Sequence, residues 1–364
     1  NKMTGTETGY SSFFFIRKAH GKFRYSFDHS YADTKYDIND IGLQFRNNFN
    51  NFGIDASYRI FEPTETWNRY SIGTYVNYTR LANPSTFTGF GFGGWANGTT
   101  RKLNSAGVNL NLNPGEQFDY FEPRKEGAFF VTKNRVNTNG WFESNSNKRL
   151  AINFYTGIET FLDEERDYVN YWFGVRPRFR YNDKFSISYG FDREYYTGDR
   201  GYVTQEGDDV IFGDRQRIEI EHTFNTSYNF NPYHTLALTL RNYWGTVKYD
   251  TQLFSLEPDG SVTSATGYTT ENISDNPDIN FTTWNFDLSY SWQFAPGSFL
   301  TALYRNQLFN VDNAARDSYL NTINTLFDQP ITHIFSVKVQ YFLDYNQIPA
   351  LFKKKNRETG ADES

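Results

Sequence analysis

Large apolar and small polar side chains alternate without a break over the eleven residues from Trp284 to Phe294. Successive side chains of a β-strand point to opposite faces, so this segment has one apolar face and one polar face. Strands of soluble sandwiches are usually shorter, about five or six residues long, and their buried faces are rich in Leu, Ile and Val. A longer strand with a mostly aromatic apolar face is typical of a strand tilted across an outer membrane, between lipid and an aqueous lumen.

The same alternation recurs along nearly the whole chain and predicts about sixteen strands. No segment shows the pattern of a convincing helix. The predicted strands cover residues 10–18, 22–31, 41–49, 52–61, 70–81, 87–99, 106–113, 135–144, 148–161, 168–181, 185–196, 217–230, 234–249, 281–295, 299–309 and 333–345.

Turn registers test the assigned faces independently, because a one-residue slip would turn every side chain of a strand to the opposite face. Three-residue hairpin loops are a common type. Four such turns agree with the faces that polarity alone assigns: Ser144 opposite Lys148, Tyr181 opposite Phe185, Phe230 opposite His234, and Ala295 opposite Phe299.

The remaining connections are long and include residues 114–134, 198–216, 250–280 and 311–332. Short turns at one end and long loops at the other are typical of bacterial outer-membrane barrels, whose long loops are extracellular. We therefore expect the end of the chain to be periplasmic. Short turns should all lie at the same end of the strands. Counted along the chain, the short turns at Gly21 and Asn50 fall at the opposite end from those after Ser144, so one strand near the N-terminus is miscounted or one loop is irregular.

The composition supports strands with one apolar face and one face in contact with water. Aromatic residues make up 19% of the 364 residues, although the mean hydropathy is -0.69 and only 38% are hydrophobic. No run approaches the roughly 18 apolar residues of a membrane helix, so insertion would require a closed barrel. No linker divides the chain. We expect residues 1–345 to form one transmembrane β-barrel and residues 346–364, which do not alternate, to form a disordered periplasmic tail.

Charge and residue usage exclude several classes of function. The net charge of -6 argues against a nucleic-acid partner, which requires a basic face. The absence of Cys excludes disulfides, thiolate metal sites and a cysteine nucleophile. The five histidines lack metal-ligand spacing, and no Gly-x-Ser-x-Gly elbow or Ser-His-Asp set can be identified. We therefore expect no enzymatic activity, no metal and no cofactor.

The strongest candidate site is a set of charges on the polar faces. Arg176, Arg178 and Arg180 alternate with apolar residues, so all three face the lumen from one strand. The turn register places Arg178 beside Ser188 and Arg180 beside Ser186. The other charged candidates facing the lumen are Glu219, Glu221, Asp287 and Lys338.

Two interpretations of these charges remain open. A basic ladder facing acidic groups across a lumen resembles the constriction of a porin, where charged rings select ions. Alternatively, the charges pair with lumenal loops or a plug and only solvate the interior. Pro177 lies within the ladder and cannot donate a backbone hydrogen bond, which indicates a bulge in the strand.

Motifs along most of the chain, in order, resemble those of one outer-membrane family. They are residues 36–42 (YDINDIG), 46–48 (RNN), 119–124 (DYFEPR), 139–141 (NGW), 211–213 (IFG), 278–281 (DINF), 291–298 (SWQFAPGS) and 341–345 (YFLDY). The resemblance is to a family of unknown function from Bacteroidetes-type bacteria. Its members usually carry a carbohydrate-binding family-9-like module ahead of a C-terminal barrel.

The resemblance implies that this chain corresponds to the C-terminal part of a longer protein. The N-terminal module and the barrel strands expected before Tyr10 have no counterpart here, so a complete barrel would exceed sixteen strands. Family members end near the motif at 341–345, whereas this chain runs on to Ser364. The chain begins at Asn1 without a charged and apolar leader, as expected for a mature protein or a fragment.

Three classes of function compete. We favour a non-enzymatic, membrane-embedded module of a multi-protein outer-membrane assembly for uptake or secretion, because the family carries an appended module and long loops can dock partners. The alternative is a free-standing diffusion or substrate-specific channel with a charged constriction. A barrel enzyme is least favoured. The expected environment is the Gram-negative outer membrane with its lipid and lipopolysaccharide. The expected partners are other outer-membrane or periplasmic proteins, and glycans bound through the missing module.

Overall fold

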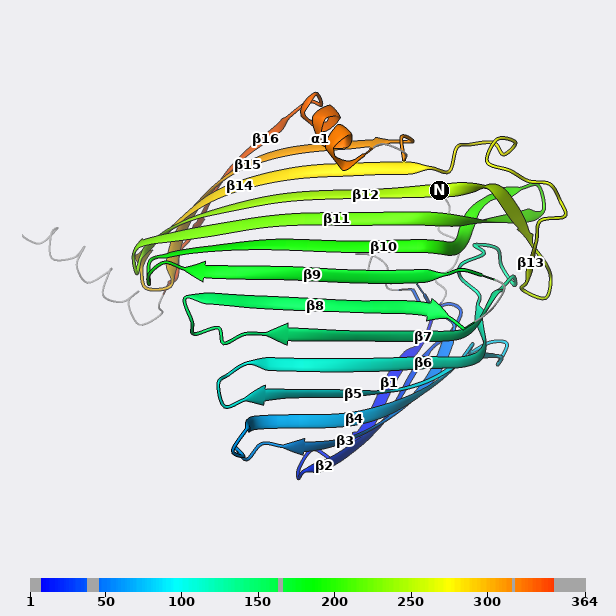
Figure 1. The fold of residues 1–364 in the computed structure, drawn as a ribbon, viewed down its shortest axis with the longest axis horizontal. Helices are drawn as coiled ribbons and strands as arrows, with labels where there is room; N and C mark the ends of the chain where they lie inside the picture. The colour runs from blue at the N-terminus through cyan, green and yellow to red at the C-terminus, as the bar shows by residue number, and fades with distance from the viewer. Residues whose placement is uncertain (1–7, 38–45, 163–165, 316–317, 344–364) are drawn as a thin grey trace, which may run out of the picture.

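The computed structural model describes residues 8–37, 46–162, 166–315 and 318–343, most of which lie in one antiparallel sheet (Figure 1). Fifteen of its strands follow one another in chain order, and the short β13 (Val262–Thr263) pairs only with β12. The fifteen are β1 (Ser11–Arg17), β2 (Phe23–Ala32), β3 (Phe49–Ile60), β4 (Trp67–Arg80), β5 (Phe87–Thr100), β6 (Ser105–Asp119), β7 (Phe130–Glu143), β8 (Leu150–Phe161), β9 (Val169–Arg180), β10 (Phe185–Glu206), β11 (Asp209–Asn231), β12 (His234–Leu256), β14 (Ile279–Ala295), β15 (Ser298–Asp312) and β16 (Thr332–Gln340). The expected all-β, antiparallel architecture is confirmed.

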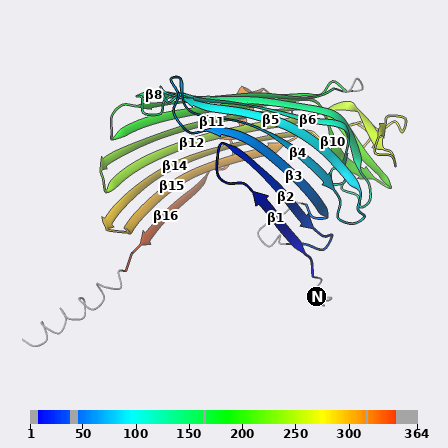
Figure 2. The same ribbon diagram turned by 90° about the horizontal axis from the view of Figure 1, so that it is seen from below.

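The sheet curves into an arch but does not close (Figure 2). Its two edges are β1 and β16, which share no ladder of hydrogen bonds. The side chains of both edge strands are exposed along their whole length. The described strands therefore form an open wall with a convex and a concave face, and not the closed ring that the sequence led us to expect.

The strand predicted at residues 41–49 lies mostly outside the described part of the chain, and its described residues before Phe49 are not in a strand. The third strand, β3, begins only at Phe49, and Arg46 to Asn48 precede it, while residues 41–45 lie outside the described part of the chain. Asn48 has a φ of 53°, a left-handed conformation that Asn tolerates better than most residues. β2 ends and β3 begins at the long-loop end, and the two strands pair directly, so no further strand lies between them in the sheet. Asn50 lies within β3, so the short turn predicted there does not exist.

The predicted faces are correct at all four turns, although the exact register is not. Between β9 and β10 the pairing of Arg180 with Ser186 agrees with the prediction, and the body of the β11–β12 ladder also agrees. Elsewhere Phe299 pairs with Gln293, two residues from the predicted partner, and Ser144 lies opposite Ile152, four residues from the predicted one. Because these slips are even, every side chain stays on its predicted face.

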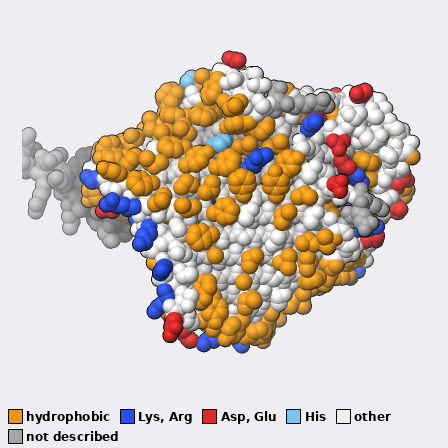
Figure 3. Space-filling model, viewed as in Figure 1, with side chains coloured by type: hydrophobic (Ala, Val, Ile, Leu, Met, Phe, Trp, Pro, Cys, Tyr) orange, Lys and Arg blue, Asp and Glu red, His pale blue; other side chains and the backbone are white. Residues whose placement is uncertain are grey.

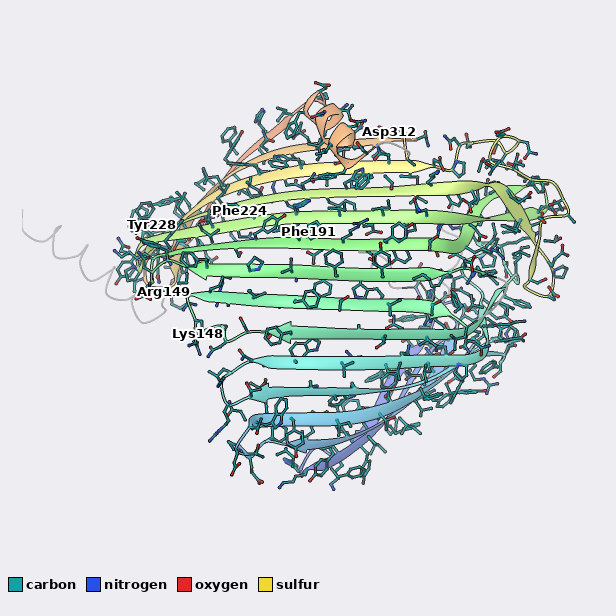
Figure 4. All side chains as sticks on the ribbon, viewed as in Figure 1. Lys148, Arg149, Phe191, Phe224, Tyr228 and Asp312 are labelled. Carbon is teal, nitrogen blue, oxygen red and sulfur yellow. The ribbon has the colours of Figure 1, made fainter. Side chains whose placement is uncertain are left out.

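The convex face carries the apolar half of the alternation. Figure 3 shows hydrophobic side chains spread over most strands, with Lys and Arg gathered at the short-turn end and Asp and Glu at the long-loop end. Phe191, Phe224 and Tyr228 lie on this face, and Lys148 and Arg149 lie at the short-turn end (Figure 4). A monomeric soluble protein rarely exposes contiguous apolar patches above a few hundred Å². The convex surface is therefore unusual for a protein surrounded only by water.

The best-buried part of the molecule lies at the long-loop end. Here β10, β11 and β12 extend to 22 or 23 residues, beyond their neighbours. Val210 and Phe212 pack with Phe130 into a small core, and Leu253 is also fully buried. The long strands therefore leave the plane of the wall and form a separate, conventionally packed cap.

One helix, α1 (Tyr319–Phe327), lies on the convex side between β15 and β16 (Figure 1) and was not predicted. Ser318 caps its N-terminus. Thr322 and Leu326 are fully buried, and Asn280 of β14 donates a hydrogen bond to Thr322 at 3.4 Å. The helix thus covers polar groups on the otherwise apolar face. Within the described residues no helix is long and apolar enough to cross a membrane.

Candidate functional site

Side chains of β7 to β12 enclose a pocket of about 400 Å³ on the polar, concave face. The pocket forms because alternate residues of paired strands point to the same side and lie close to one another. Its lining residues are Asn137, Tyr155, Asn170, Trp172, Arg176, Asp192, Arg193, Glu194, Glu219, Glu221 and Tyr243. Three of the seven charges predicted from the sequence, Arg176, Glu219 and Glu221, meet there.

The arginine ladder exists, but its members have different partners. Arg176 donates to both carboxylate oxygens of Asp192 at 3.1 Å. Arg178 donates to the backbone carbonyl of Ser146 in a short turn at 2.5 Å. Arg180 lies at the short-turn end, beside a separate pocket of about 300 Å³ that Lys184 also lines. Only the first arginine of the ladder therefore belongs to the central pocket.

The ladder also has the predicted neighbours. Ser188 pairs with Arg178 and Ser186 with Arg180. The expected bulge at Pro177 is absent, because the register between β9 and β10 is the same on both sides of it, and Pro177 pairs with Ile152 of β8. Proline has no backbone N–H, so one hydrogen bond between the strands is absent there, but no extra residue is inserted.

The predicted acids belong to a larger carboxylate group. Glu219 pairs directly with Glu194, and Glu221 pairs with Asp192 on the neighbouring strand. Like charges directly opposite each other destabilise a sheet, so each carboxylate needs a cation or a hydrogen-bond donor. The donors are Arg176 on Asp192, Arg217 on Glu219 at 3.0 Å, Arg241 on Glu221 at 3.4 Å, and Asn170 on Glu194 at 3.2 Å.

The last two predicted charges lie outside the pocket. Asp287 of β14 accepts two hydrogen bonds from Arg305 of β15, both at 2.7 Å, in a bidentate ion pair. Lys338 lies on the edge strand β16, opposite Thr301. The charged set is thus spread around the arch and does not form a single ring.

Indole rings extend over glycines on the concave face. Trp141 of β7 covers Gly107 of β6, and Trp172 of β9 covers Gly157 of β8 so closely that a Cβ on either glycine would collide with the indole. A third indole, Trp95, covers Gly73 in the same way. The rings can extend over the neighbouring strand only because that strand has no side chain at that point.

Asparagines fill the space between these rings. Asn109 donates to Asn139 at 2.8 Å, and Asn137 donates to Glu159 at 3.0 Å. Asn111 pairs with Asn137 across neighbouring strands. Because Asn111 lines a second pocket of about 540 Å³ and Asn137 lines the central one, the two pockets are joined by an amide-lined strip.

Beside this strip, at the long-loop end of β9, the surface is buried and polar. Asn170 is 6% exposed, and its Oδ1 has no hydrogen-bond partner among the described residues. Tyr168, in the loop before β9, donates to Glu159 at 2.9 Å. Burial, reinforced by the Glu159 carboxylate, raises the pKa of the Tyr168 phenol, which therefore stays a neutral donor.

The five histidines do not converge. His222 lies on the convex side, 2.6 Å from the hydroxyl of Tyr189 and close to the ring of Tyr319. No group of three or more His, Asp or Glu residues in the described ranges is arranged to hold a metal ion.

The sequence contained signals for several residues that the prediction missed. Asp192, Glu194 and Arg241 occupy polar positions of the alternation, so they share a face with the predicted charges. Their proximity could not be inferred, because it depends on the register between strands. The ring-over-glycine pairs depend on the same register.

The comparisons with known proteins agree with the family expectation at a coarse level. A comparison with curated proteins gave no match. A family model described as a domain of unknown function (DUF5916) matches residues 1–352. Since this match covers nearly the whole of the 364-residue chain, the chain belongs to the DUF5916 family of unknown function.

Proposed function

We propose that this chain forms most of the wall of an integral outer-membrane β-barrel, and that it serves as the non-enzymatic membrane module of a multi-protein assembly for uptake or secretion. The observation that carries the proposal is the convex face. Large apolar side chains protrude from it on successive strands, with exposed fractions of 56% for Ile54, 58% for Ile72 and 51% for Val108. Lipid is the solvent in which such a face is stable.

The polarity of the two ends supports an orientation. Lys and Arg at the short-turn end of the convex face suit the phosphate groups of phospholipids on the periplasmic side (Figure 3). The long loops and the cap around Phe212 would then lie outside the cell, in contact with lipopolysaccharide and with partners. The C-terminal residues would lie in the periplasm.

The edges of the sheet support an assembly. The strands alternate in direction, and β1 and β16 are the first and fifteenth of them, so the two edges run parallel to each other. Closing the ring with antiparallel pairs alone would require an odd number of further strands. An exposed edge carries a row of unpaired N–H and C=O groups, which hydrocarbon does not tolerate. These strands would come from the remainder of a longer polypeptide or from a partner, and a glycan-binding module of the family type could be attached there.

Gentle detergent extraction from the native membrane tests this proposal. We expect the chain in the outer-membrane fraction, resistant to carbonate washing and recovered with a reproducible set of outer-membrane or periplasmic proteins. Recovery in the soluble fraction would refute membrane insertion. Repeated recovery of the chain without other proteins would refute the assembly but not the proposal that the chain forms a membrane wall.

A second candidate, a channel with a charged constriction, is favoured by the central pocket. The paired carboxylates Asp192 and Glu221 project from the concave face of β10 and β11, and Arg176 of β9, two residues along from the position opposite Asp192, reaches Asp192 diagonally. Planar-bilayer recordings test this candidate. Arg176→Glu should shift the reversal potential toward cation selectivity, whereas Lys338→Glu, outside the pocket, should shift it less. Silent bilayers with the full-length protein would refute an open channel.

A further inference from the structure

Two indole faces are displayed side by side on the concave surface. Trp141 and Trp172 each rest on a glycine of the preceding strand, and both side chains are half-buried. Each indole is thus covered on the side of the sheet and remains partly exposed. The third indole, Trp95, differs because the guanidinium of Arg59 lies 5.7 Å from its ring centre. The open platforms are therefore those of β7 and β9.

The platforms have a defined spacing. Strands β7 and β9 are separated only by β8, and neighbouring strands lie about 4.8 Å apart. The two indoles are consequently offset by about 10 Å across the sheet and, because Trp141 pairs with Tyr155 whereas Trp172 pairs with Gly157, by about 7 Å along it. The resulting separation of roughly 12 Å is close to the length of two linked hexose units, so alternate sugars of an extended oligosaccharide that crosses the strands obliquely could stack on the two rings.

Between the platforms the surface offers hydrogen-bond groups that suit hydroxyls. Asn137 and Asn139 have amides with both donor and acceptor atoms. Tyr155 pairs with Trp141 across the strands, and its hydroxyl is bonded to Asp192. A sugar hydroxyl can both donate and accept, so mixed amide, phenol and carboxylate groups match it better than they match a simple ion.

The pocket wall contains one buried acceptor that no described residue satisfies. Asn170 lines the pocket and is 6% exposed, and its Oδ1 has no partner among the described residues, although its Nδ2 donates to Glu194. A buried polar atom without a partner costs about 1–3 kcal/mol. A hydroxyl entering the pocket beside Trp172 could donate to this oxygen.

The electrostatics of the pocket favour a neutral ligand. Three of its four acids pair with a cation within the wall, Asp192 with Arg176, Glu219 with Arg217 and Glu221 with Arg241, and the fourth, Glu194, accepts hydrogen bonds from Asn170 and Tyr196. Because Arg193 also lines the pocket, the numbers of acids and arginines at it are equal, and neither charge predominates. The volume of about 400 Å³ is within the range of small-ligand pockets, roughly 300–1,000 Å³.

We infer that the concave face between β7 and β10 binds a neutral linear oligosaccharide, with sugar rings stacked on Trp172 and Trp141 and hydroxyls bonded to Asn137 and Asn170. The apolar C–H face of a pyranose packs on an indole, while its rim of hydroxyls reaches the surrounding amides. This inference rests on the proposed function in one respect, since the concave face must be the face in contact with water.

Titration calorimetry on the detergent-solubilised full chain tests the inference. The probes are maltohexaose, cellohexaose, laminarihexaose and chitohexaose, with glucose as the monomer control. We expect at least one hexasaccharide to bind, and Trp172→Ala to weaken it at least about tenfold, equivalent to 1.4 kcal/mol. Trp172→Phe should retain most of the affinity. The matched control is Trp292→Ala on the convex face, which should leave binding unchanged.

The possible outcomes separate the two proposals. Absence of binding to all four hexasaccharides at about 1 mM (−4.1 kcal/mol) would overturn the inference, while fractionation with the outer membrane would still support the wall. Equal losses from Trp172→Ala and Trp292→Ala would also overturn it. Misfolding is excluded if both variants keep the heat-dependent gel mobility of the parent protein. A soluble chain would refute the wall instead.

Discussion

A lysine on the convex face should destabilise the protein much more than a lysine one residue away on the concave face. Phe224 of β11 is the best test position (Figure 4), because it pairs with Tyr189 and Leu240 on the apolar side. It lies seven residues from Asn231 at the short turn. A rise of about 3.4 Å per residue and a tilt of about 45° place it roughly 17 Å from that turn. This depth is close to the middle of a hydrocarbon core about 30 Å thick.

The expected magnitude follows from this depth. A Lys at the bilayer midplane on the lipid-facing side of a barrel costs about 2–4 kcal/mol. This corresponds to a decrease of roughly 30-fold to 700-fold in the folding equilibrium constant. The control, Thr223→Lys, points to the concave side. It removes the 3.0 Å hydrogen bond from Thr223 to Glu221 but places an ammonium near that carboxylate, so its cost is about 1 kcal/mol or less.

The assay is urea unfolding of the full chain in phospholipid vesicles, followed by heat-dependent gel mobility and tryptophan fluorescence. Phe224→Lys should lower the unfolding free energy by about 1–4 kcal/mol more than Thr223→Lys does. Equal effects of the two variants would refute the assignment of faces. A parent protein that stays dispersed without detergent, and a Phe224→Lys variant that is more soluble than it, would refute the lipid-facing interpretation altogether.

Three further predictions concern other parts of the wall. Gly157→Val should displace the ring of Trp172 and lower stability by about 1–3 kcal/mol, measured by urea unfolding, and unchanged indole fluorescence would contradict the stacking. Leu326→Ala should lower the unfolding free energy by about 2–5 kcal/mol or release α1 locally, which faster hydrogen exchange in residues 319–327 would reveal. Arg305→Met, which breaks the partly exposed pair with Asp287, should cost only about 0.2–1 kcal/mol, and a larger loss of stability would show that the pair acts within a network.

Much of the fold could be predicted because the strand period is two. Side-chain polarity alone assigned the faces correctly, and turn slips of two or four residues did not disturb them. The third strand was placed too early, because the alternation does not mark where a strand begins: β3 starts only at Phe49 and runs through the turn predicted at Asn50. The helix α1 was missed because nine residues are too few to show a clear helical period, and its buried residues Thr322 and Leu326 are covered only by tertiary packing.

The site was harder to predict than the fold. Alternation gives the face of each residue, but proximity between strands depends on the register to within one pair. The prediction therefore placed Arg176 and Glu221 on a common face. Asp192, which lies opposite Glu221 and forms an ion pair with Arg176, was identified only from the observed strand register. Asp287 was predicted without its partner, although Arg305 also occupies a polar position of its strand. Trp172 was not recognised, because an isolated indole at a position of the polar face produces no repeating pattern in the sequence.

The curvature of the arch and the display of the indoles have a common physical origin. Bending a sheet brings the side chains of its concave face closer together, so large residues fit there only beside small ones. Gly107 beneath Trp141 and Gly157 beneath Trp172 satisfy this requirement, and both indoles stay partly exposed. A change that merely relieves crowding, such as Trp172→Ala, should therefore leave the wall folded while removing the platform. A glycine replacement should affect both properties together. Comparing the two kinds of variant distinguishes rings kept only for packing from rings kept for a ligand, because only in the second case should Trp172→Ala lose binding without losing stability.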